Sequence, residues 1–214
     1  MPTKHLPQIS DFVTEWATSS VGGGGHIFWD VIARTESLIA EEISRLGPDY
    51  RVSNGVAIHE SASVEEAAVV KGPAIISPNT FIAANAYLRG GVYIGKGCIV
   101  GPSCELKTTF MFEGSKVAHL SFVGDSIIGS QANIEAGAII ANYRNERDDK
   151  HIRINWSNRV IETGIDKLGA LVGDGVRIGA NAVVAPGALL ASGTVIPRLG
   201  LVDQAPPNAS STQL

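Results

Sequence analysis

Cysteines, aromatic residues and long hydrophobic runs are all scarce in this chain of 214 residues. Its two cysteines, Cys98 and Cys104, are too few for the disulfide framework of a small secreted protein. Aromatic residues make up 6% of the chain, which argues against a globule built around large rings. No apolar run approaches the roughly 20 residues that span a bilayer, so we expect no membrane partner.

A strong charge of either sign is also lacking. The formal net charge is −4, which argues against nucleic acid or an anionic membrane as a partner. The N-terminal stretch "MPTKHLPQISD" lacks the apolar core of a signal peptide, and we expect a cytoplasmic protein. Glycine, by contrast, is abundant, with 24 residues in a chain that is 44% hydrophobic. This composition predicts a close-packed, repetitive backbone with a sizeable core.

The sequence repeats with a period of six residues. Large apolar residues mark the first series: Val64, Val70, Ile76, Ile82, Leu88, Ile94, Val100, Leu106 and Phe112. The period slips near His119. It then returns at Ile128, Ile134 and Ile140, is lost over about 143–171, and resumes at Val172, Ile178, Val184, Leu190 and Ile196.

Neither a helix nor ordinary strand alternation produces a period of six. One hexad is too short to bury its own apolar face, but stacked hexads can do so in a parallel β-solenoid. We therefore expect a solenoid over residues 57–200, with a loop excursion at about 143–171. Residues 1–56 are predicted to be a linker and a helical cap over the first coil, and residues 201–214 a disordered tail.

The hexads resemble those of the hexapeptide-repeat acyltransferases. This resemblance implies an all-β fold, a left-handed parallel β-helix with three flat sides, in which three hexads form one coil of 18 residues. Cys98 and Cys104 then occupy small inward positions, where a buried, inert thiol is expected.

The apolar residues of the series should point inward, and the residue directly after each of them should point outward. Three of these outward positions carry Arg89, Lys107 and His119, whose side chains are charged or titratable. Arg89 and Lys107 are 18 residues apart, so they should stack on one face about 5 Å apart and attract an anion such as phosphate. His119 follows Lys107 by 12 residues and should belong to another face. If Lys107 and His119 serve one site, that site lies in a groove between two prisms, as a homotrimer would provide.

The segment "CELKTTFMFEGSKVAHLSFVGDSIIGSQANIEAGAIIANYRN" has a more specific resemblance. It resembles the acetyltransferase half of the bifunctional glucosamine-1-phosphate acetyltransferase/N-acetylglucosamine-1-phosphate uridyltransferase family. The resemblance implies an acetyl-CoA-dependent N-acetyltransferase that acts on an amino-sugar phosphate and requires no metal. It places the general base at His119 with Glu105 beside it, and the sugar phosphate on Arg89 and Lys107.

The resemblance also assigns further binding residues. Substrate contacts fall on Asn133 and Phe122, and by a looser alignment on Lys150. Contacts with acetyl-CoA fall on a second group: Asn142, Tyr143 and Ala136.

Several positions depart from the family pattern. Phe122 replaces a tyrosine, Glu135 replaces a glycine beside Asn133, and the excursion replaces a short loop. No glycine-rich nucleotide loop follows a strand near the N-terminus, so we expect no uridyltransferase half in this sequence.

Three other functions stay open. One is a non-catalytic solenoid that binds a nucleotide sugar or assists a separate nucleotidyltransferase. Another is an acyltransferase with a different acyl donor. A zinc carbonic anhydrase needs three converging histidines, and only His119 lies on the central repeats.

Overall fold

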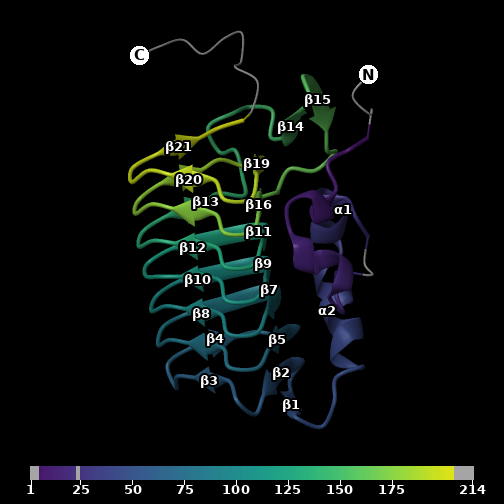
Figure 1. Cartoon of the computed structure of the whole chain (residues 1–214), viewed down its shortest axis with the longest axis vertical. Helices are drawn as coiled ribbons and strands as arrows, with labels where there is room; N and C mark the ends of the chain where they lie inside the picture. The colour runs from purple at the N-terminus through teal and green to yellow at the C-terminus, as the bar shows by residue number, and fades with distance from the viewer. Residues whose placement is uncertain (1–4, 23–24, 205–214) are drawn as a thin grey trace.

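The computed structural model describes residues 5–22 and 25–204. Short strands wind into a three-sided parallel solenoid, and two helices lie along one of its sides (Figure 1). The prediction of a left-handed parallel β-helix with an N-terminal helical segment is confirmed.

The strands form three faces, which we number in the order in which the chain reaches them from β3 onward. Face one holds β3 (Ser63–Val64), β6 (Phe81–Ile82), β8 (Ile99–Val100), β10 (Lys116–Val117), β12 (Asn133–Ile134), β17 (Arg177–Ile178) and β20 (Val195–Ile196). Face two holds β4 (Val69–Val70), the first halves of β7 (Tyr87–Ile94), β9 (Glu105–Met111) and β11 (Phe122–Ile128), and then β13 (Ile139–Ile140), β18 (Val183–Val184) and β21 (Leu201–Val202). Face three holds β2 (Val56–His59), β5 (Ala74–Ile76), the second halves of β7, β9 and β11, β16 (Ala170–Val172) and β19 (Ala188–Leu190). β1 (Tyr50–Ser53) pairs antiparallel with β2.

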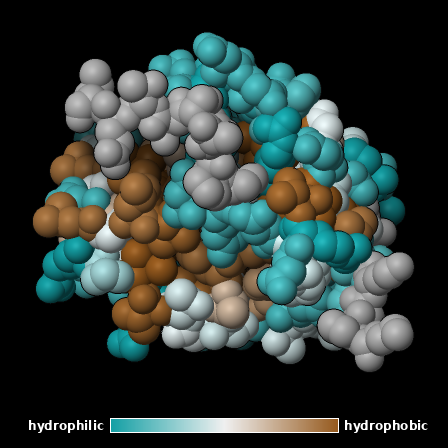
Figure 2. Space-filling model, turned by 90° about the horizontal axis from the view of Figure 1, so that it is seen from above, coloured by the Kyte–Doolittle hydropathy of each residue, from teal (hydrophilic) through white to brown (hydrophobic). Residues whose placement is uncertain are grey.

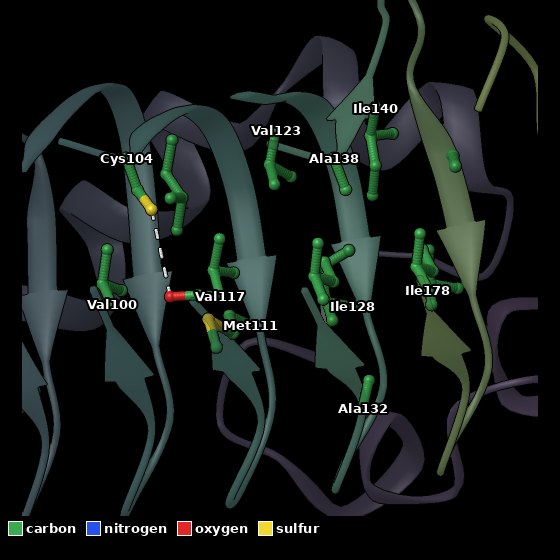
Figure 3. Packing of buried hydrophobic residues seen from close by; sticks show 14 of the residues in the cluster. Val100, Cys104, Met111, Val117, Val123, Ile128, Ala132, Ala138, Ile140 and Ile178 are labelled. Carbon is green, nitrogen blue, oxygen red and sulfur yellow. Dashed lines mark hydrogen bonds between the residues drawn. The ribbon is translucent and has the colours of Figure 1, made fainter. Parts of the chain in front are cut away.

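The core of the solenoid is a column of aliphatic side chains, stacked coil upon coil and close to fully buried. Each such side chain stabilises the fold by about 1.5–3 kcal/mol through burial. Met111 points into this column together with Val117 and Ile128 (Figure 3). The expectation that Phe112 holds the inward position is therefore wrong. Phe112 packs in a second hydrophobic cluster outside the solenoid.

This error has a physical cause at the corner between faces two and three. In β7 the chain turns this corner through two residues with positive φ, Gly90 and Gly91, whereas β9 and β11 each use one, Thr108 and Asp125. The register between β7 and β9 shifts at this point. The side that starts at Leu106 is therefore one residue shorter than a hexad.

The N-terminal segment lies along face three and does not cap the first coil, so the expectation of a cap is wrong. It comprises η1 (Ile9–Asp11), η2 (Thr14–Thr18), α1 (Phe28–Ala33) and α2 (Thr35–Ile43). The N-terminal segment lies there because the outward-facing side chains of face three, which alternate with the inward ones, are large and apolar. Its outward residues Ile75, Phe110, Ile127, Leu171 and Leu189 pack with the N-terminal segment in the second cluster. None of the described helices is long and apolar enough to cross a membrane.

The excursion leaves face two after β13 and rejoins face three at β16, close to the expected bounds. It contains a hairpin of β14 (Arg153–Trp156) and β15 (Arg159–Glu162). The buried Arg144 guanidinium binds the Asp203 carboxylate at 2.6 Å and so fastens the excursion to the last coil. The solenoid itself extends to β21, beyond the expected boundary at residue 200. Residues 205–214 of the expected tail lie outside the described residues.

Candidate functional site

His119 lies on the corner between faces one and two. The outward position after the inward Val117 belongs to Ala118, so the expectation that His119 holds such a position is wrong. The side that starts at Leu106 is one residue short, so the next inward position falls at Val117, one residue earlier than the six-residue period predicts. The His119 carbonyl accepts a hydrogen bond from the Gly137 N–H at 2.8 Å. Its ring is exposed and forms no hydrogen bond with the residues that the structure describes, which leaves the imidazole available to a ligand.

Lys107 and His119 border the same face, not different faces as expected. Lys107 lies on the face-two half of β9, near the corner with face three. His119 lies just before β11, which is the face-two strand of the next coil and pairs with β9. One side of the coil lies between the two corners, and its strand residues rise by about 3.3 Å each.

Arg89 and Lys107 stack on paired strands, as their spacing predicted. Each cation already has a carboxylate partner. The Arg89 guanidinium lies 2.6 Å from the Glu105 carboxylate, and the Lys107 ammonium lies 2.5 Å from that of Asp125. The Arg89–Glu105 pair is about one third exposed and should add less than about 1 kcal/mol to stability. The Asp125 side chain is only 5% exposed, so its pairing matters more.

Asp125 is the residue of this site that the sequence analysis missed. Its carboxylate accepts hydrogen bonds from the Lys107 ammonium and the Asn142 amide. Its main-chain carbonyl accepts from the Gly169 N–H at 2.9 Å, where the excursion ends. Asp125 thus joins the implied phosphate-binding lysine to an implied coenzyme contact. It directly follows Gly124, the residue that pairs with Lys107 on the next strand, so the approximate length of one coil is the signal that could have identified it.

Phe122 and Asn142 lie next to each other over Gly124. A Cβ atom at Gly124 would come within 2.8 Å of both side chains, so glycine is what lets them pack together. The predicted residues Lys107, Phe122 and Asn142 therefore come together in one subunit, close to Asp125.

Tyr143 and Lys150 lie at the start of the excursion. The Tyr143 ring is 38% exposed and has two ammonium groups near it, that of Lys150 at 5.4 Å and that of Lys167 at 6.0 Å. The Lys150 ammonium donates to three main-chain carbonyls and so holds the loop together. Lys167, which the sequence analysis did not single out, makes no such bonds among the described residues.

Asn133 lies on face one, away from Lys107. It lines a cavity of about 230 Å³ together with Glu135 and Arg198. The Ala180 N–H and the Arg198 guanidinium both bind the Glu135 carboxylate and lower its pKa. The negative charge of Glu135 is therefore compensated by groups of the same chain. Ala136 lies beside His119, on the same corner one coil further on.

The excursion and the end of α1 border an open cavity of about 410 Å³. Its lining residues are Ile32, Ala33, Asp125, His151, Gly164, Ile165, Asp166 and Lys167. Nδ1 of His151 lies 2.7 Å from Oδ1 of Asp166. Among residues 5–22 and 25–204, no three His, Cys, Asp or Glu side chains form a group that could hold a metal ion.

The family model described as "GMPPB C-terminal domain" matches residues 70–154. The bifunctional sugar-1-phosphate nucleotidylyltransferase/acetyltransferase of Sulfurisphaera tokodaii is 45% identical over 83 residues, which are 39% of this chain and 20% of that protein. The bifunctional protein GlmU of Methanococcus maripaludis is 38% identical over 100 residues, which are 47% of this chain and 24% of that protein. The chain thus spans about a quarter or less of these relatives.

Among solved structures, the N-acyltransferase AntD from Bacillus cereus, in complex with dTDP and 3-hydroxybutyryl-CoA, is 20% identical. The match covers 77% of this chain and 78% of that one, with a TM-score of 0.36. The sequence matches confirm the resemblance to the hexapeptide-repeat acyltransferases.

Proposed function

We propose that the protein is an acetyl-CoA-dependent N-acetyltransferase that acts on an amino-sugar phosphate similar to glucosamine 1-phosphate. The observation that carries the proposal is the network at Asp125, which joins Lys107 to Asn142 beside Phe122. By resemblance these side chains would contact the sugar phosphate and acetyl-CoA. Relatives whose names include an acetyltransferase activity support the same reaction.

In this reaction the sugar amine attacks the thioester carbonyl carbon of acetyl-CoA. A C–N bond forms, the C–S bond breaks, and coenzyme A leaves as a thiolate that takes up a proton. The attacking nitrogen becomes acidic and must lose a proton. By resemblance His119 accepts it, since imidazole can accept protons at neutral pH. A main-chain N–H at a corner would stabilise the developing oxyanion.

The charges on face two are complementary to such a substrate. Arg89 and Lys107 supply cations for the phosphate, and their partners Glu105 and Asp125 supply carboxylates. An amino-sugar phosphate carries both an ammonium group and a phosphate, so it can engage both signs. Glu105 would also help to hold the amine near His119.

The acetyl-CoA side would lie beyond Asn142. The exposed Tyr143 ring and the ammonium groups of Lys150 and Lys167 form a cationic, partly aromatic surface there. Such a surface suits a phosphorylated nucleotide. Ala136, near His119, would be a further contact with acetyl-CoA, and Asn133 with the sugar.

We also propose a homotrimer, with the reaction in the grooves between subunits. Outward side chains Ile139, Val183 and Leu201 form an exposed apolar row on consecutive strands of face two. Leu120, next to His119, is 70% exposed, and hydrophobic surface is visible from the C-terminal end of the solenoid (Figure 2). A second subunit would cover such surface. Light scattering should give a trimer mass, and a monomer at micromolar concentration would contradict this assembly.

The reaction itself is tested by thiol release. Acetyl-CoA is mixed with each member of a panel of amino-sugar phosphates, and free coenzyme A is measured. Release that depends on the amino sugar supports the proposal. If no panel member promotes release, but another acyl-CoA does, the acyl donor is different. If no acyl donor reacts, a non-catalytic binding role takes the place of the transferase.

A further inference from the structure

A third cation, Lys71, lies beside Arg89 and Lys107 and has no role in the reaction described so far. It precedes Arg89 by 18 residues, the same spacing that separates Arg89 from Lys107. Lys71 directly follows Val70, which pairs with Leu88 on β7. Arg89 follows Leu88 and pairs with Lys107 on β9. The three cations therefore form a row across consecutive coils, with backbones about 5 Å apart from one coil to the next.

The charge of this cation row is compensated unevenly. The Lys107 ammonium lies 2.5 Å from the Asp125 carboxylate, and the Arg89 guanidinium lies 2.6 Å from that of Glu105. Lys71 is exposed and forms no ion pair with the residues that the structure describes. Three cations with two carboxylates leave one uncompensated positive charge, and it lies at the Lys71 end of the row. An anionic ligand is attracted to that end.

Tyr87 brings two cations of the row to one aromatic ring. Nζ of Lys71 lies 5.1 Å from the centroid of the Tyr87 ring, and Cζ of Arg89 lies 5.7 Å from it. The ring attracts both cations through its quadrupole, although the two like charges repel each other. An anion that contacts both cations would remove this repulsion.

Tyr87 also supplies a hydrogen-bond donor that the neighbouring strands lack. The outward residues that pair with one another along face two, from β4 to β13, are Val69, Tyr87, Glu105, Phe122 and Ile139. Only Tyr87 among these five carries a hydroxyl group. This hydroxyl makes no hydrogen bond with the described part of the chain, so it can donate to a ligand. The donor and the uncompensated charge thus lie at the same end of the row.

We propose that Lys71 and Tyr87 are further binding residues for the phosphate of the acceptor, which lies over Arg89 with one lysine of the row on either side. A phosphate monoester carries a charge of about −1.5 to −2 and three acceptor oxygens, so it can engage several donors at once. The long lysine side chains can reach it from the adjacent coils. This inference rests on the proposed function, whose acceptor phosphate it takes as the ligand.

Calorimetry on the full chain measures the binding without turnover, with glucosamine 1-phosphate and inorganic phosphate as probes. Lys71→Ala should weaken the binding of both probes by about 10-fold or more, through the loss of a charge-assisted hydrogen bond. Tyr87→Phe keeps the ring and removes the hydroxyl, and should weaken both by about 2- to 10-fold. In thiol release, Lys71→Ala should raise KM for the amino-sugar phosphate and leave kcat nearly unchanged.

Lys116→Ala is the matched control. Lys116 is an exposed lysine of β10 on face one, so its removal changes the net charge equally but leaves the cation row intact. Its phosphate affinity should equal that of the unaltered protein. Unchanged affinity in Lys71→Ala, an equal loss in Lys116→Ala, or no binding of either probe by the unaltered protein would overturn the inference.

The failure of this inference can be distinguished from the failure of the proposed function. Phosphate binding that depends on Lys71, without thiol release from any acyl donor, removes the transferase and keeps the phosphate site. Acetylation of an amino-sugar phosphate with the same KM in Lys71→Ala as in the unaltered protein keeps the transferase and removes Lys71 from the site.

Discussion

The two ends of face two are built differently. At the corner of Asp125, a nearly buried carboxylate binds an ammonium group, an amide and, through its backbone, the returning excursion. At the corner of His119, the imidazole is exposed, and the next residue, Leu120, is 70% exposed. One end is complete within a subunit, and the other presents its side chains to whatever packs against it.

This difference separates two tasks of a transferase. Groups that hold charged ligands benefit from fixed positions, because pre-organised hydrogen bonds do not have to be formed at each turnover. In the proposed trimer, the base would lie at a subunit boundary, where the second subunit would supply the remaining wall. Changes at the His119 end should therefore affect rate far more than stability, and changes at the Asp125 end should affect both.

The largest effect is expected at His119. His119→Ala should lower turnover by about 10²- to 10⁴-fold, since it removes the proposed proton acceptor. The melting temperature and the affinity for acetyl-CoA should change little, because the ring is exposed and makes no hydrogen bond with the described residues. The measurements are thiol release and calorimetric titration of acetyl-CoA. Full activity in this variant, or a failure to fold, would show a structural residue.

The next effect concerns Arg89 and Lys107. Removing a charge-assisted hydrogen bond costs roughly 1.5–3 kcal/mol, so Lys107→Ala should weaken binding of an amino-sugar phosphate by about 10- to 150-fold. The oligomer should stay intact, which light scattering checks. Unchanged sugar-phosphate affinity in the double variant Arg89→Ala/Lys107→Ala would place the phosphate elsewhere.

A smaller effect, on the free energy of unfolding, is expected at the two ion pairs of face two. Asp125→Asn leaves a largely buried Lys107 without its counter-charge and should lower the free energy of unfolding by about 1.5–3 kcal/mol. Glu105→Gln breaks the more exposed pair with Arg89 and should cost less than about 1 kcal/mol. Urea denaturation measures both. Equal losses would mean that burial does not distinguish the two pairs.

The sequence predicted the repeat architecture well because a period of six has one structural solution that buries its apolar residues. The six-residue period misplaced Met111 and His119 by one residue. The corners differ in their number of residues, and the apolar pattern shows that number only once the next strand has begun. The cavity could not be predicted. His151 and Asp166 meet only because the excursion folds back, and Ile32 reaches them from a helix more than a hundred residues earlier in the chain.

The smallest effect is expected at the two cysteines, which contrast with the exposed His119. Cys98 and Cys104 lie inside the solenoid with exposed fractions of 0% and 1%. The Cys98 thiol donates to the Phe112 carbonyl at 3.0 Å, and burial raises its pKa to about 12. Burial also raises the pKa of Cys104.

Since the thiolate is the reactive form, neither thiol should react with a disulfide reagent such as DTNB at pH 8 in the native protein. In urea both thiols should react, giving two equivalents per chain. The native protein would then add no background to a thiol-release assay, so colour formed in that assay reports coenzyme A alone. Fast reaction of even one native thiol would show that the wall of the solenoid opens near these coils, next to the strands that carry Arg89 and Lys107.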